Sequence, residues 1–228
     1  MKLCPTAAGA AVIALALPAV ASAATLSVDP AKPCYRSGES VNLAGTGFTP
    51  SVPSGVNVTR DGSAFGSLTT DALGNVAGRL NLGEDSGRRT STYVATDVTN
   101  PALTASLQLT VSAVEVNVRP KGGRPGRRVR IGATGFTTGK NLWIHVRKRG
   151  FKRDFKIGRL KGACKRLVAK RRVLPRGAAT GVYTVQFDTF RRYKRSRKVR
   201  ALYTITVTRT LRPAAASAAT SVGWSRVF

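Results

Sequence analysis

The chain has 228 residues and a formal net charge of +28, because 38 Lys and Arg residues outnumber ten Asp and Glu residues. Three cysteines and one histidine are too few for a zinc-built fold or a disulfide-built miniprotein, so a hydrophobic core must hold the chain together. On this composition we expect neither a metal ion nor any other cofactor.

Residues 1–23 have the features of a signal peptide. Lys2 precedes a short apolar run from Ala10 to Leu17, and Ala21-Ser22-Ala23 matches the small-residue site that a signal peptidase cleaves. The apolar run is far shorter than the roughly 20 residues that cross a bilayer, and no second such run follows it. We therefore expect cleavage after Ala23, export to the cell envelope or the extracellular space, and no integral membrane span.

One phrase then occurs twice. The segment "GESVNLAGTGFTP" from Gly38 aligns without a gap with "GRRVRIGATGFTT" from Gly126, and "TYVATD" from Thr92 matches "VYTVQFD" from Val182 more loosely. A repeat of about ninety residues indicates two related structural units in tandem. We call residues 24–112 unit one and residues 113–208 unit two.

Both units consist of short segments in which apolar and polar residues alternate. Val41 and Leu43 show this pattern in unit one, and Val129 and Ile131 show it in unit two. Glycine-containing turns separate these segments, and no sustained helical period follows residue 24. About seven short strands in each unit predict an all-β fold of two antiparallel sandwiches.

The repeated phrase, together with "STYVA" and "GVYTV", resembles the immunoglobulin-like domains of secreted and cell-envelope proteins of bacteria. Immunoglobulin domains have a tyrosine two residues before a cysteine on the sixth strand. Tyr93 and Tyr183 match that tyrosine, whereas Ala95 and Val185 occupy the cysteine position. The resemblance thus implies two tandem sandwiches that lack the intersheet disulfide, and it implies no catalytic activity.

The positive charge is confined to the second half of the chain. Residues 24–112 hold six Lys or Arg and seven Asp or Glu, whereas residues 113–228 hold 31 Lys or Arg and only three Asp or Glu. In a seven-stranded sandwich the first, third and fifth connections lie at one end, which for unit two is the end far from unit one. We expect these connections to form a distal cap of fourteen cations: Arg119, Lys121, Arg124, Arg127, Arg128, Arg147, Lys148, Arg149, Lys152, Arg153, Lys170, Arg171, Arg172 and Arg176.

Clustered cations attract polyanions, so we expect a polyanionic partner such as an acidic wall polymer, an acidic polysaccharide or an anionic lipid surface. Two alternatives stay open: a structural spacer or adhesin rod without a specific ligand, and non-specific binding of nucleic acid. An enzyme is disfavoured because the single histidine, His145, is expected to be an exposed strand residue and no nucleophile motif is found.

Cys34 and Cys164 are the two cysteines of the mature chain. The expected topology places both at the junction between the units, and export permits oxidation. We therefore hypothesise a Cys34–Cys164 disulfide across the junction, with two separate thiols as the alternative.

Residues 209–228 are rich in Ala and Ser and have no obvious partner strand. We expect this tail to be disordered.

Overall fold

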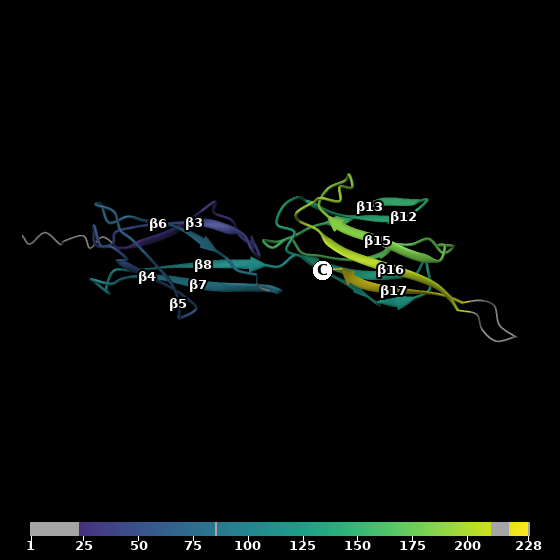
Figure 1. The fold of residues 1–228 in the computed structure, drawn as a ribbon, viewed down its shortest axis with the longest axis horizontal. Coiled ribbons are helices and arrows are strands. Elements are labelled where there is room, and N and C mark those ends of the chain that lie inside the picture. Colours follow the sequence, from purple (N-terminus) through teal and green to yellow (C-terminus); the bar gives the residue numbers. More distant parts are fainter. Residues whose placement is uncertain (1–22, 85, 211–218, 228) are drawn as a thin grey trace, which may run out of the picture.

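The computed structural model describes residues 23–84, 86–210 and 219–227, and all regular secondary structure in these ranges is β-strand. Residues 1–22 of the predicted signal peptide lie outside the described residues. The strands form two sandwiches that follow one another along the long axis of the molecule (Figure 1). In the described part of the chain, no helix has the length and apolarity needed to cross a membrane.

Unit one contains eight strands in two sheets. One sheet has the order β1-β3-β6 and the other has the order β2-β8-β7-β4-β5. All pairs are antiparallel except β2 with β8, which is parallel. The strands are β1 (Thr25–Asp29), β2 (Tyr35–Arg36), β3 (Ser40–Thr46), β4 (Val56–Arg60), β5 (Ser63–Leu68), β6 (Val76–Asn81), β7 (Arg88–Asp97) and β8 (Thr104–Ser112).

Unit two repeats this order and adds one strand. Its three-stranded sheet has the order β9-β11-β14, and its six-stranded sheet has the order β10-β17-β16-β15-β12-β13. The strands are β9 (Glu115–Arg119), β10 (Gly122–Gly123), β11 (Arg128–Thr134), β12 (Asn141–Lys148), β13 (Phe151–Arg159), β14 (Leu167–Arg172), β15 (Gly181–Asp188), β16 (Ala201–Thr210) and β17 (Ala219–Val227).

The alternation seen in the sequence produces both cores. Val41 and Leu43 of β3 are buried on either side of the exposed Asn42, and Val129 and Ile131 of β11 are buried on either side of the exposed Arg130. Each set of inward side chains packs into its own hydrophobic cluster, one per unit. Two separate cores explain why the chain forms two sandwiches and not one.

Of the tail predicted to be disordered, residues 211–218 and 228 lie outside the described residues, and residues 209 and 210 end β16. The expectation is also wrong for residues 219–227. These residues form β17, which pairs antiparallel with β16 from Leu202 opposite Val227 to Thr210 opposite Ala219. Trp224 is buried, and its ring meets the Tyr203 ring edge-on at 6.1 Å. The prediction relied on the Ala- and Ser-rich composition, but these residues form a strand that pairs with the strand before it. Unit two therefore extends to Val227 and not to residue 208.

The junction between the units is short and tightly packed. Ala113 and Val114 are the only residues between β8 and β9. Gly135, in the repeated phrase, has φ of +77°, and a Cβ atom there would lie 1.9 Å from the Ala113 carbonyl oxygen. Only glycine allows this close approach of two backbone segments.

A disulfide also joins the two units at the junction. Cys34 and Cys164 are bonded, with their Cα atoms 5.2 Å apart and a separation of 130 positions in sequence. Both cysteines are buried, and the Cys164 carbonyl oxygen accepts a hydrogen bond from the Gly135 backbone N–H at 3.0 Å. The bond therefore ties unit one to the connection between β13 and β14, which is in turn hydrogen-bonded to Gly135 beside the linker.

Candidate functional site

The first, third and fifth connections of unit two meet at its far end. Gly126 of the first connection packs against Arg176 of the fifth connection. Lys148, at the end of β12 where the third connection begins, donates a side-chain hydrogen bond to the backbone oxygen of Thr180 in the fifth connection. The far end is the right-hand end of the molecule in Figure 1. The backbone arrangement expected for the distal cap is therefore present.

Four of the fourteen cations have partners within the protein. The Lys148 ammonium also lies 4.8 Å from the centre of the Tyr183 ring. The Arg153 guanidinium donates to the Val173 carbonyl oxygen, and that of Arg171 donates to the Ile157 carbonyl oxygen. Arg147, the fourth, lies on the outer face of the six-stranded sheet and pairs with Asp154. These four side chains anchor loops and strands, so the predicted cap is smaller than the sequence suggested.

Several of the other cations lie in rows on the outer face of the three-stranded sheet. Arg130 of β11 is directly opposite Arg119 of β9 on one side and Lys170 of β14 on the other. In the next row, Arg128 is directly opposite Arg172. All five side chains are exposed. Opposite positions in antiparallel strands bring Cβ atoms to about 4.5–5.5 Å, so five like charges are concentrated on one face.

Arg130 was missed by the sequence analysis, which assigned cations to the connections between strands. The signal was available in the alternation of β11, because Arg128 and Arg130 flank the inward Val129 and must therefore share the outer face. The predicted members Lys121, Arg124, Arg127, Arg149, Lys152 and Arg176 are exposed around the far end or on β13.

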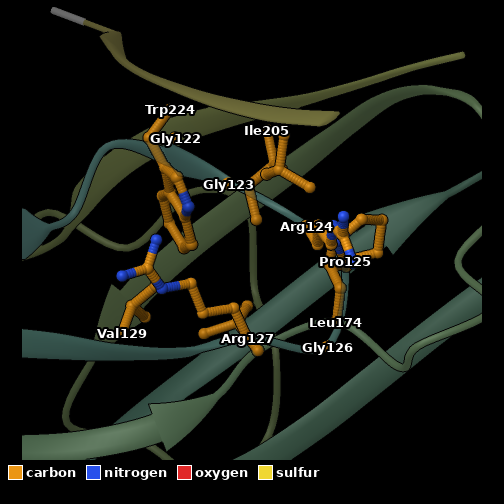
Figure 2. Close-up of a pocket in the computed structure, with 12 residues that line it drawn as sticks. Gly122, Gly123, Arg124, Pro125, Gly126, Arg127, Val129, Leu174, Ile205 and Trp224 are labelled. Atoms are coloured by element: carbon orange, nitrogen blue, oxygen red, sulfur yellow. The ribbon is translucent and has the colours of Figure 1, made fainter. Parts of the chain in front are cut away.

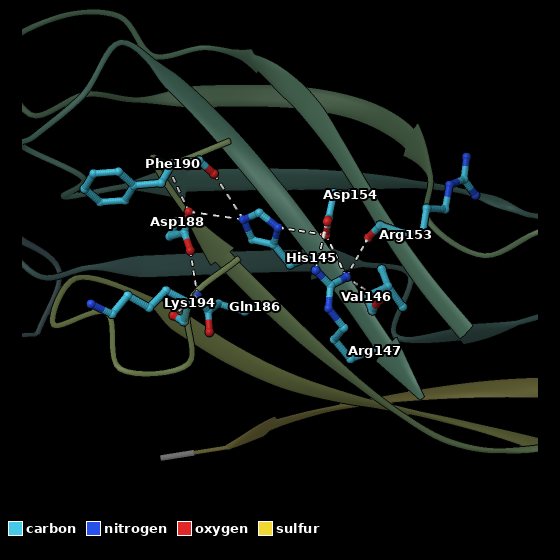
Figure 3. Close-up of polar contacts among 9 residues, drawn as sticks. All are labelled: His145, Val146, Arg147, Arg153, Asp154, Gln186, Asp188, Phe190 and Lys194. Atoms are coloured by element: carbon cyan, nitrogen blue, oxygen red, sulfur yellow. Dashed lines mark hydrogen bonds and ion pairs between the residues drawn. The ribbon is translucent and has the colours of Figure 1, made fainter. Parts of the chain in front are cut away.

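His145 is buried, which contradicts the expectation of an exposed strand residue (Figure 3). Its Nδ1 lies 2.9 Å from an Asp154 carboxylate oxygen, and its Nε2 lies 3.3 Å from Asp188 and 3.1 Å from the Phe190 carbonyl oxygen. Burial lowers the pKa of His145, but the hydrogen bonds and charges of Asp188 and Asp154 outweigh it and raise the pKa above its usual value. With acceptors on both sides, the doubly protonated ring suits this site.

The histidine is covered because the connection between β15 and β16 folds back over it. Asp188 accepts a hydrogen bond from the Phe190 N–H at 2.8 Å, and the Gln186 amide donates to the Lys194 carbonyl oxygen at 3.1 Å. The Tyr193 ring lies near the histidine ring, and the Arg147 guanidinium stands 4.4 Å from the centre of that Tyr193 ring. The polar cluster therefore fixes a loop that carries seven Lys and Arg residues between residues 189 and 200.

A small pocket lies between the Gly122–Arg127 connection and Trp224 (Figure 2). Ile205 and Leu174 close it from the core side. Its volume of about 20 Å³ has room for about one water molecule, so it is a packing gap beside β17 and not a ligand site.

The three acidic residues of unit two all have hydrogen-bond partners in the protein. Glu115 accepts a hydrogen bond from the Gly87 N–H at the junction, and Asp154 and Asp188 both contact His145. Among the described residues no group of three or more His, Cys, Asp or Glu side chains could hold a metal ion.

The strand orders place the chain in the class of immunoglobulin-like β-sandwich proteins. No family model and no curated protein matches the chain. A solved structure of a Corynebacterium diphtheriae protein described as membrane anchored is similar at 13% identity and a TM-score of 0.33, covering 81% of this chain and 55% of that chain. Bovine butyrophilin is similar at 12% identity and a TM-score of 0.27, covering 72% of this chain and 92% of that chain.

The chain thus spans about half the length of the bacterial structure. Similarities at this level do not bear on function, which has to be argued from the surface of unit two.

Proposed function

We propose that the protein is an exported, non-catalytic binding protein made of two bacterial immunoglobulin-like domains, in which unit two holds a polyanion electrostatically. The observation that carries this proposal is the set of exposed cations on unit two, which far outnumber its three carboxylates, Glu115, Asp154 and Asp188. Acidic polymers of the cell envelope and acidic polysaccharides are the partners that this surface suits.

The proposed location, in the envelope or outside the cell, rests on the sequence of residues 1–23. A Cys34–Cys164 disulfide agrees with it, since such bonds persist in oxidising compartments.

A spacer or adhesin rod is the second candidate, and the junction favours it. A two-residue linker, a disulfide and a backbone contact at Gly135 brace the units end to end. Non-specific nucleic-acid binding is a third candidate, because phosphate chains are polyanions too.

The test is retention of the mature protein on isolated cell walls and on a heparin-like resin over a salt series. Polyanion binding predicts retention that weakens steeply with salt, because bound counterions are released when several anionic groups are neutralised. Retention on walls that does not change between about 50 and 500 mM salt would favour the adhesin, since the stronger screening at higher salt would weaken electrostatic binding.

A further inference from the structure

A shallow hollow lies beside the rows of cations because Gly132 of β11 has no side chain. Asn117, Arg119, Arg130 and Val168 line the hollow with it, and its volume is about 360 Å³. A Cβ atom at Gly132 would meet only the Asn117 carbonyl oxygen, at 3.9 Å. The hollow therefore exists because position 132 has no side chain to fill it.

A second hollow continues from the first toward unit one. It shares Asn117, Gly132 and Val168 with the first, has a volume of about 320 Å³, and reaches Arg166 of unit two and Arg88 of unit one. The two hollows thus run along β11 with cations at both ends. Seven strand residues at about 3.3 Å each give a length of roughly 20 Å.

Cations outnumber carboxylates along this line, whose two hollows have a single carboxylate, Glu115, among their lining residues. No ion pair to any of the five row cations occurs among the described residues, and Glu115, at the junction end, is held by the Gly87 N–H. Like charges directly opposite one another destabilise a sheet. A bound anion removes that repulsion, so the face gains stability when it is occupied.

We propose that this line, from Arg128 and Arg172 to Arg166 and Arg88, binds a linear polymer that carries closely spaced phosphate groups, with one part of the polymer lying over Gly132. This inference rests on the proposed function and names its site and ligand chemistry. We call the site the phosphate track.

The type of cation favours phosphate. Four of the five row cations are arginines, and the flat guanidinium group can donate two parallel hydrogen bonds to one phosphate. Neighbouring strands lie about 4.8 Å apart, so several cations reach the same short stretch of the bound polymer. A polymer with widely separated carboxylates would meet fewer of them.

The experiment compares two triple variants of the mature protein with the same change in net charge. The track variant is R119Q/R130Q/K170Q, and the matched control is R124Q/R149Q/R176Q, which removes three exposed cations of the distal loops. The probes are long-chain inorganic polyphosphate and poly(glycerol phosphate), with hyaluronan as the sparsely charged contrast, each titrated over a salt series.

We expect the track variant to bind both phosphate polymers at least tenfold more weakly, with a salt slope shallower by about two, and the control to change less than threefold. Equal losses in the two variants would overturn the phosphate track while leaving polyanion binding by net charge intact. Hyaluronan binding as tight as polyphosphate binding would overturn the phosphate preference. Failure of the wild-type protein to bind any of the three polymers would instead overturn the proposed function.

Gly132→Val tests the hollow without changing charge. Valine suits a strand, and its Cβ has room at this position, so the fold should persist by circular dichroism. We expect affinity for poly(glycerol phosphate) to fall at least threefold with an unchanged salt slope. An unchanged affinity in a folded variant would show that no part of the chain sits over Gly132, and the track would be wrong.

Discussion

The three-stranded sheets of units one and two have the same strand order, but one row of exposed side chains across these sheets differs in charge. In unit one the row across β1, β3 and β6 is Asp29, Asn42 and Arg79, whose charges balance. In unit two the corresponding row across β9, β11 and β14 is Arg119, Arg130 and Lys170. The same three-stranded sheet forms in unit one without these cations, so the fold does not require them. Their concentration in unit two therefore points to a role in binding.

The second difference between the units is β17. In unit one β2 pairs directly with β8, whereas in unit two β17 lies between β10 and β16 and is antiparallel to both. Unit two is thus wider by one strand on its six-stranded sheet. Both tryptophans of the chain, Trp143 and Trp224, belong to unit two, so tryptophan fluorescence reports on unit two alone.

The largest effect is expected from the bond that joins the two units. Cys34→Ser with Cys164→Ser should lower the free energy of unfolding by about 4–5 kcal/mol, the chain-entropy estimate for so long a loop. Urea unfolding of the oxidised protein and of the double variant measures this. Mass spectrometry of the unreduced mature protein provides the control, since two alkylatable thiols there would contradict the bond itself.

Trp224→Ala should cost unit two about 3–5 kcal/mol, because a large buried ring is lost from β17. Urea unfolding followed by the fluorescence of Trp143 measures the loss. Val227→Ala, at an exposed position of the same strand, should change stability by less than about 0.5 kcal/mol. A variant at Trp224 as stable as the one at Val227 would mean that β17 does not pack on unit two.

The two copies of the repeated phrase should respond differently to Gly→Ala. At Gly47, with φ of +84°, the nearest atom to an added Cβ is 3.2 Å away, so the cost is mainly that of a strained backbone, about 1–3 kcal/mol. At Gly135 the added Cβ would lie 1.9 Å from a backbone oxygen, so the junction must move as well. We expect G135A to be clearly less stable than G47A in thermal unfolding, and equal losses would argue against the close packing of the linker.

The smallest effect is a pH dependence confined to unit two. The pKa of His145 is raised in the folded state, so its stabilising contribution is complete below about pH 6.5 and is lost as the pH rises through the folded value. The urea midpoint of unit two should therefore decrease as the pH rises above about 6.5.

His145→Asn, which introduces the residue that unit one has at Asn57, is the control for this prediction. It should flatten the pH dependence even though it also lowers stability by removing hydrogen bonds. A wild-type midpoint that rises over the same range would contradict the raised pKa of His145.

The sequence was sufficient for the features that depend on local pattern. Alternation over five to seven residues indicated the strands, because side chains point to opposite faces with a period of two. The repeated phrase indicated two units, and counting charges located the excess of cations. Even Arg130 could have been placed on the outer face of β11 from its spacing to Val129 alone.

Only the tertiary structure decided what each side chain meets, because the neighbours in a sheet come from strands far apart in the sequence. Register places Arg130 between Arg119 and Lys170, and no local pattern encodes that register. A folded-back loop buries His145, and pairing with β16 orders residues 219–227 despite their composition. These contacts depend on packing between segments that are distant in sequence, so the candidate site could not be predicted from local sequence patterns.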